Sequence, residues 1–394
     1  MKKTEETTVI KKFSLFIVLC FAVTLFGENT QDALLQQIGL PLFPKEQKLT
    51  HTEFEKKFLS HGIRFNGNPA KRTAFIREKK IFGVAAKELH IISNKDGIVE
   101  QTDVIFNNKG DTERHTNGRI RSDARMLKKN LTDLFGVKSK EKFDAEGVGL
   151  KIPTWSHGDT KITLESVRKE YTILHIVYPA AAKGKSDKQV TIEDLKKNIV
   201  RNDNGDVFIK NIPMIDQGPK GYCAVATLER VLLYYGIKNV TQHQLADTAN
   251  TGDGGGTSWS NLVNAAKLVT KKYDFSMISC GNVNFKSVKK YIDKGVPILW
   301  CMYNNDNYYA IVKKSRQDRE ACKNLKTWLK SIKRYKVSSR GGAHICLIIG
   351  YNEETEEIAV SNSWGDEEIK PGWVPLKSAR KVSQGICGVL IPDK

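Results

Sequence analysis

The second half of the chain contains a cysteine, a histidine and an asparagine whose types and surroundings suit acyl transfer. Cys223 follows the loop 217–222 and opens an apolar, helix-like segment that ends at Gly236. The N-terminus of a helix has unpaired N–H groups and a partial positive charge, which stabilise a thiolate, the nucleophilic form of cysteine. A single cysteine at a helix start is more often structural, so Cys223 can be assigned as a nucleophile only if partner residues are found.

Two further residues are candidates for these partners. His344 stands at the head of the apolar run 345–349, and Asn362 follows the apolar run 358–360 closely, so both are predicted at the ends of buried strands. Catalysis by a thiolate needs a proton carrier and a group that orients it. The order cysteine, histidine, asparagine therefore predicts a nucleophile, a base and an orienting amide.

The motifs around these residues resemble those of papain-like cysteine peptidases, and the closer likeness is to secreted bacterial thiol peptidases with Gln-Gly-x-x-Gly-Tyr-Cys. Gln217 precedes Cys223 by six residues, as in the family, and Asn-Ser-Trp-Gly begins at Asn362. The run 254–259, Gly-Gly-Gly-Thr-Ser-Trp, is similar to the family's Gly-Gly-x-x-Trp loop, and residues 385–388 read Gly-Ile-Cys-Gly. The resemblance covers residues 206–394.

The resemblance implies an α+β domain, with a helical subdomain that carries Cys223 and an antiparallel β subdomain that carries His344 and Asn362. It also implies an oxyanion hole made by the side chain of Gln217 and the backbone N–H of the cysteine. Trp364 would either shield the histidine–asparagine contact from water or simply pack in the core. The substrate-binding residues that the resemblance implies are Gly221, Gly255, Gly256, Trp259 and Trp364.

The predicted function is hydrolysis of peptide bonds in proteins or peptides by a secreted cysteine endopeptidase. No cofactor or metal is expected, because the cysteines and His344 lack the paired spacing of metal ligands. The same triad would also suit a cysteine amidase, a transglutaminase or a cell-wall peptidase. A binding or adhesion protein with a decayed triad is a further alternative. The Gln217 loop and the Asn-Ser-Trp-Gly motif favour the interpretation as a papain-like peptidase.

The first half of the chain is predicted to be a smaller α+β domain, residues 28–185, followed by a polar linker, residues 186–205. Thr52 and Glu55 have the spacing of a capping box at the start of a helix. The runs 89–93 and 99–106 flank Asn-Lys-Asp-Gly, which indicates a hairpin. No catalytic motif occurs here, so this domain is predicted not to be a second enzyme but to control access to the second half of the chain, either by inhibiting it or, as we favour, by recruiting substrate.

The N-terminus has the layout of a secretory signal, assigned to residues 1–27. Four lysines precede an apolar run from Phe13 to Phe26, which is short for a membrane span. The protein is therefore expected to be secreted or to reside in the cell envelope, with no stable membrane span once the signal is removed. Leu25-Phe26-Gly27 is a poor match to a signal-peptide cleavage site, so an uncleaved N-terminal membrane anchor is the alternative.

The formal net charge is +19, and its densest basic stretch is residues 313–340. We interpret this stretch as a helix from Ser315 through Leu325 to Ile332 with its cations exposed to solvent, and a binding site for an anionic surface or polymer is the alternative. Nucleic acid is not an expected partner, because no binding motif accompanies the charge. Six cysteines lie outside the signal, which permits at most two disulfides besides the nucleophile, and Cys346 is expected to be a buried thiol.

Overall fold

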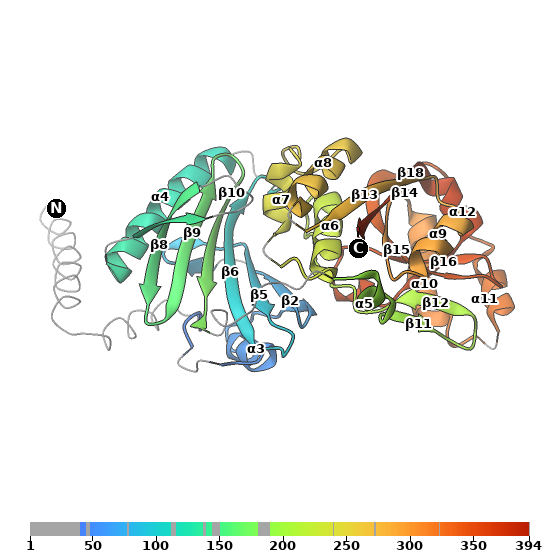
Figure 1. Ribbon diagram of the computed structural model, residues 1–394, viewed down its shortest axis with the longest axis horizontal. Coiled ribbons are helices and arrows are strands. Elements are labelled where there is room, and N and C mark those ends of the chain that lie inside the picture. Colours follow the sequence, from blue (N-terminus) through green and yellow to red (C-terminus); the bar gives the residue numbers. More distant parts are fainter. Residues whose placement is uncertain are drawn as a thin grey trace, which may run out of the picture. The chain divides into compact units, whose positions relative to one another are not determined.

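The computed structural model describes residues 40–44, 48–76, 79–111, 116–136, 139–143, 150–179, 190–238, 240–271, 273–322 and 324–393. The chain divides into two compact units (Figure 1). The first comprises Met1–Arg64, Ala74–Asn107 and Asn117–Lys183, and the second comprises Phe65–Thr73, Asn108–Thr116 and Gly184–Lys394. The predicted signal, residues 1–27, lies outside the described residues. The second unit therefore draws on two short segments from the first half of the chain.

The first half of the chain is α+β, as predicted. Its helices are α3 (His51–Leu59) and α4 (Thr116–Phe135), and its strands are β1 (Asn66–Asn68), β2 (Lys71–Phe75), β3 (Lys80–Ile81), β4 (Val84–Ala85), β5 (Glu88–Ser93), β6 (Val99–Asn108), β7 (Ser139–Phe143), β8 (Leu150–His157), β9 (Thr160–Val167) and β10 (Tyr171–Val177). One sheet has the order β1-β2-β5-β6-β10-β9-β8-β7. The predicted hairpin is confirmed as β5 and β6, with Leu89 opposite Val104. Helix α4 packs on this sheet, where Thr172 Oγ1 of β10 donates to the carbonyl oxygen of Ile120 at 3.5 Å.

The predicted capping box of the first helix was wrong by two residues. Thr50, not Thr52, is the N-cap of α3, and its side chain and Glu53 exchange the two capping hydrogen bonds. Both threonines have an acidic residue three positions later, so the sequence pattern cannot choose between them. Thr50 is chosen because it forms an antiparallel bridge with Ile98, which holds its backbone extended and makes the helix begin directly after it.

The second unit is α+β with a predominantly antiparallel sheet, which confirms the predicted fold. Its helices are α5 (Ile192–Lys196), α6 (Cys223–Tyr234), α7 (Gln242–Thr248), α8 (Trp259–Thr270), α9 (Phe285–Ile292), α10 (Asp306–Asp318), α11 (Leu325–Ile332), η2 (Asp366–Glu368) and α12 (Leu376–Val382). Its strands are β11 (Ile199–Arg201), β12 (Asp206–Ile209), β13 (Phe275–Gly281), β14 (Ile298–Asn304), β15 (Gly342–Asn352), β16 (Glu357–Ser361), β17 (Gly372–Pro375) and β18 (Ser383–Pro392). The sheet order is β11-β12-β15-β14-β18-β13, and β16 joins β15 to β17. The range predicted as a linker, 186–205, thus contributes α5 and β11 to this unit.

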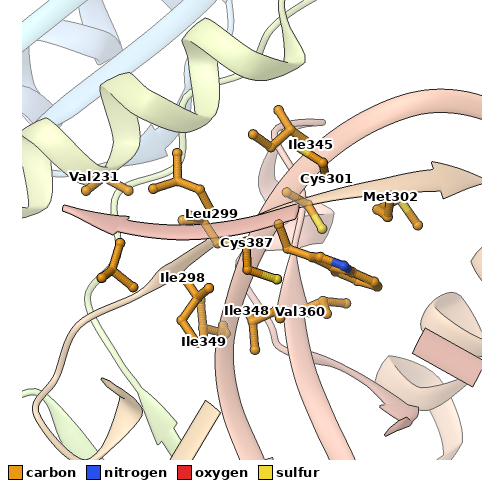
Figure 2. Packing of buried hydrophobic residues seen from close by; sticks show 14 of the residues in the cluster. Val231, Ile298, Leu299, Cys301, Met302, Ile345, Ile348, Ile349, Val360 and Cys387 are labelled. Atoms are coloured by element: carbon orange, nitrogen blue, oxygen red, sulfur yellow. The ribbon is translucent and has the colours of Figure 1, made fainter. Parts of the chain in front are cut away.

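The core of the second unit lies between α6 and the sheet. Figure 2 shows Val231 of α6 close to Leu299 of β14, and Ile348 of β15 lies in the same apolar cluster. Every residue of α6 after Cys223 is buried, including Glu229 and Arg230. Because a buried charge is costly unless it is paired and hydrogen-bonded, both charged residues must find partners inside the unit.

Glu229 finds its partner in one of the two segments from the first half of the chain. Lys71 forms an ion pair with Glu229, and both side chains are almost fully buried. The other carboxylate oxygen of Glu229 accepts from the backbone N–H of Gln242 at 2.6 Å. In the second segment, the carbonyl oxygen of Lys109 accepts from the N–H of Gly254 at 2.9 Å. Residues far before the peptidase-like motifs therefore complete the packing around α6 and the glycine-rich loop.

Removing the charge of Lys71 should destabilise the second unit much more than removing an exposed lysine. In Lys71→Met, Glu229 stays buried and loses its cation, and breaking one side of a buried ion pair costs about 3–5 kcal/mol. The measurement is the urea midpoint at which Cys346, a fully buried thiol of this unit, becomes open to alkylation. Lys289→Met is the matched control, because Lys289 pairs with Glu353 at the exposed surface. Equal urea midpoints for the two variants would contradict the assigned role of Lys71.

Candidate active site

Cys223 is the first residue of α6, as the sequence predicted. Its N-cap residue, Tyr222, makes no side-chain capping hydrogen bond, so no side chain caps the first turn of the helix. One turn later, Thr227 Oγ1 donates to the carbonyl oxygen of Ile345 at 3.3 Å. The helix start is thereby tied to β15 next to His344, and the thiol of Cys223 lies within reach of the backbone N–H of Ile345.

His344 and Asn362 are brought together across β15 and the end of β16. The imidazole Nε2 lies 3.1 Å from Oδ1 of Asn362, and both side chains are buried. The ring of Trp364 covers the imidazole, with ring centroids 4.7 Å apart and an interplanar angle of 30°. Tyr309 of α10 packs edge-on against Trp364 at 5.3 Å. Trp364 thus contacts the histidine directly and is itself packed against α10.

Gln217 is held in the loop before α6 by three hydrogen bonds. Its backbone N–H donates to the carbonyl oxygen of Ser363 at 2.9 Å, and its Oε1 accepts from Ser363 Oγ at 2.8 Å. Its Nε2 donates to the carbonyl oxygen of Lys220 at 2.7 Å. A carboxamide nitrogen has two N–H donors, and Lys220 uses one of them. Both side-chain heavy atoms of Gln217 thus have a defined partner, and one N–H of the amide is assigned to Lys220.

The predicted substrate-binding glycines meet next to the cysteine loop. Gly221 donates to the carbonyl oxygen of Gly254 at 3.1 Å and accepts from the N–H of Gly256 at 2.8 Å. A Cβ on Gly255 would lie only 2.3 Å from the Cα of Gly221, so a larger residue cannot stand there. The N–H groups of all three loop glycines donate within the unit, and the carbonyl oxygens of Gly254 and Gly256 accept from the N–H groups of Gly221 and Gly252. Trp259 lies apart from them, with its ring against Gly388 of β18.

Three charged residues that the sequence reasoning missed surround Asn362. Glu368 Oε2 accepts from the backbone N–H of Asn362 at 3.2 Å and from its Nδ2 at 2.9 Å. Arg316 of α10 forms a two-pronged ion pair with Glu368, one prong being Nη1 to Oε1 at 2.7 Å. Arg230 of α6 donates to the carbonyl oxygen of Asn362 at 2.7 Å. The acidic run 366–368, directly after Asn-Ser-Trp-Gly, was the one sequence signal for this cluster.

The predicted solvated helix over residues 315–332 was wrong in two respects. The structure has two helices, α10 and α11, and Asn324 caps the second one. Two arginines of the stretch are also buried instead of exposed. Arg316 pairs with Glu368, and Arg319 pairs with Asp206 and Glu357. The exposed cations on α11 and just after it include Lys326, Lys330, Lys333, Arg334 and Lys336.

The electrostatic surroundings favour neutral forms of both reactive groups at rest. Burial raises the pKa of the Cys223 thiol, although the backbone N–H groups of Ile345, Ala224 and Cys223 itself act in the opposite direction. Burial lowers the pKa of His344 to about 4, opposed by the hydrogen bond with Asn362 and by the negative charge of Glu368. Burial thus acts against the charged form of each group, the thiolate of Cys223 and the imidazolium of His344.

The described cysteines are free thiols in this structure, and the expectation that Cys346 is buried is confirmed. Within the described parts of the chain, no helix combines the length and apolar character needed to span a membrane.

Comparisons with known proteins identify the family to which this region is similar. Residues 209–381 match the Peptidase_C39 like family. The search of the curated proteins found no match.

Several solved structures resemble part of the chain. The peptidase domain of Streptococcus ComA, a bi-functional ABC transporter involved in a quorum sensing pathway, is 17% identical, with a TM-score of 0.29, over 46% of this chain and 98% of its own. A C39-like peptidase from Bacillus anthracis is 18% identical, with a TM-score of 0.32, over 48% and 98%. Xylellain, a cysteine protease from Xylella fastidiosa, is 13% identical, with a TM-score of 0.25, over 53% and 91%. Likenesses at this level do not bear on the activity of this chain.

The family match covers the cysteine helix, the histidine strand and the strand that leads to Asn362. The second half of the chain is thus an α+β domain whose residues 209–381 are similar to a family of cysteine peptidases, the Peptidase_C39 like family.

Proposed function

We propose that this protein is a secreted endopeptidase that cleaves peptide bonds through the triad Cys223, His344 and Asn362. The observation that carries the proposal is the buried pairing of His344 Nε2 with Asn362 Oδ1, next to the point where Thr227 ties the turn of Cys223 to β15. A histidine anchored through Nε2 keeps Nδ1 for proton exchange, which is the requirement for a general base beside a thiol.

The reaction would proceed in two acyl-transfer steps. As the sulfur of Cys223 bonds to the substrate carbonyl carbon, Nδ1 of His344 takes the thiol proton. The second N–H of Gln217 and the backbone N–H of Cys223 would stabilise the resulting oxyanion. The imidazolium then donates its proton to the leaving amine, the C–N bond breaks and a thioester remains. Water, deprotonated by His344, attacks the thioester, and the released acid and the restored thiol close the cycle.

Export and attraction to anionic partners belong to the same proposal. The basic and apolar start of the chain supports export, and the exposed Lys326, Lys330 and Lys333 on and after α11 would favour an anionic surface or polymer at low salt. Peptide substrates would pair as extended strands with the carbonyl oxygens of the loop that contains Gly255.

Replacing Cys223 should abolish peptide hydrolysis without affecting folding. Cys223→Ala removes the nucleophile, and Cys322→Ala is the control, because Cys322 is a free and partly exposed thiol of the same unit. Casein digestion measures activity, and mass spectrometry after mild iodoacetamide treatment measures which thiol reacts. Hydrolysis that survives in Cys223→Ala would assign the nucleophile to another residue.

Gln217→Ala should lower kcat by about 10²–10³-fold and change KM little, as expected for a donor that acts on the transition state. Ser363→Ala is the matched variant, since it removes the hydrogen bond to Gln217 Oε1 and keeps both amide donors. Steady-state kinetics on a fluorogenic peptide distinguish the two variants. A loss confined to KM in Gln217→Ala would count against an oxyanion role.

The pH dependence of alkylation and of hydrolysis should be that of a neutral Cys223 thiol and a neutral His344 imidazole in the resting protein. Because the pKa of the Cys223 thiol is raised, its alkylation by iodoacetamide should keep increasing above neutral pH, relative to glutathione measured in parallel. A pre-formed thiolate–imidazolium pair would instead react at a constant rate from weakly acidic pH upward. Hydrolysis should decline on the acid side only near pH 4, where His344, with its pKa lowered to about 4, takes up a proton and stops acting as a base. A constant alkylation rate below neutral pH would overturn this description.

A further inference from the structure

Asn362 has a defined partner for each of its polar groups. Its backbone N–H and its Nδ2 both donate to Glu368 Oε2, and its backbone carbonyl oxygen accepts from Arg230. Its Oδ1 faces Nε2 of His344 at 3.1 Å. Asn362 is therefore fixed on the one side by two charged groups from other elements and presents only its amide oxygen to the histidine.

The charge of Glu368 decides which way this amide points. An ionised carboxylate is only an acceptor, so the atom of Asn362 that faces it must be the NH2 group. The amide oxygen is then directed to His344, where it accepts from a protonated Nε2. With its proton on Nε2, the neutral imidazole has a bare nitrogen at Nδ1, which is the form that can take the proton of a thiol.

Arg316 holds the carboxylate in place. Both prongs of its guanidinium contact Glu368, and its Nε donates to the carbonyl oxygen of Lys370 at 2.8 Å. The glutamate side chain is 1% exposed and that of Arg316 is 10% exposed, so water does not weaken the pair. The hydrogen bond from Ser361 Oγ to the backbone carbonyl of Glu368, at 2.9 Å, fixes the main chain of the short helix as well.

From this geometry we infer that Glu368, held by Arg316, is a positioning residue that imposes the amide orientation of Asn362 and thereby the tautomer of His344. The inference rests on the proposed function of His344 as the base. It gives the basic stretch 313–340 a part in the peptidase domain, because Arg316 on α10 reaches the triad through Glu368 and Asn362.

The charged and titratable groups that face Glu368 come from three elements. Arg316 and the two neighbouring tyrosines, Tyr308 and Tyr309, come from α10, Arg230 comes from α6, and His344 and Cys346 come from β15. Arg316 and Arg230 are the two cations of this set, and Arg316 contacts the carboxylate directly.

The test compares Glu368→Gln with the wild type by nitrogen NMR of isotope-labelled histidines at neutral pH. The signals of His344, one of eight histidines, are assigned with His344→Gln. The wild type should show the proton on Nε2 and a bare Nδ1. A glutamine can turn either its oxygen or its nitrogen toward Asn362, so the variant should show a second population with the proton on Nδ1. Glu367→Gln, an exposed neighbour on the same short helix, should match the wild type.

Steady-state kinetics provide a second test on the same variants. Glu368→Gln should lower kcat by about 10- to 100-fold, the usual effect of removing a group that orients an active-site ligand, with KM within about twofold. Glu368→Asp keeps a carboxylate and should restore the wild-type tautomer at least in part. If Glu368→Gln fails to fold, the double variant Glu368→Gln, Arg316→Gln removes both charges, so that the guanidinium of Arg316 is not left without its carboxylate.

The outcomes separate this inference from the proposed function. A wild type with its proton on Nδ1, or a folded Glu368→Gln variant with an unchanged tautomer, would overturn the positioning role whether or not the protein cleaves peptides. An altered tautomer in a protein without hydrolytic activity would support the positioning role and refute the proposed endopeptidase.

Discussion

Arg230 is the buried cation on which the arrangement of the peptidase domain depends. It lies on α6, two turns after Cys223, and is 1% exposed. Its Nε donates to the carbonyl oxygen of Pro213 at 2.8 Å, and its Nη atoms bond Ser361 and Asn362. One guanidinium therefore connects the cysteine helix, the segment that leads to the Gln217 loop and the turn that carries the orienting amide. A planar group with five fixed donors suits this task, whereas the single ammonium of a lysine would not reach all three.

The free-energy cost of burying Arg230 and Arg319 is offset by hydrogen bonds and by nearby opposite charges. The pKa of Arg230 is lowered to about 10 by burial, and the negative charge of Glu368 acts against that change. Arg319 is paired on both of its sides, with Asp206 and Glu357, and stacks on Trp373 at 4.2 Å. Such clusters tolerate little change, because removing one partner leaves the others charged in a medium of low polarity.

The elements that the sequence predicted well are those whose signals are local. Cys223 at a helix start, the hairpin of β5 and β6, and the buried strand after His344 each follow from a turn motif or an apolar run. The prediction failed where two local patterns were equivalent, as for the capping boxes of Thr50 and Thr52, and where a charge has a distant partner.

Long-range pairing explains the remaining errors. Arg316 resembles any surface cation in the sequence, and only the fold shows that it faces Glu368, which lies 52 positions later. Lys71 and Glu229 are 158 positions apart and belong to the same packed unit. No periodicity or spacing rule connects such residues, so the polar neighbours of the triad had to come from the structure.

The amide of Asn362 connects two groups with opposite hydrogen-bonding requirements. It offers hydrogen-bond donors to a carboxylate on one side and an acceptor to an imidazole on the other, which no acidic side chain can do while ionised. An aspartate at this position would bring two negative charges into contact and would itself have to stay protonated. The identities of residues 362 and 368 are therefore interdependent, so an acidic residue at position 362 would fit this framework only together with a neutral residue in place of Glu368.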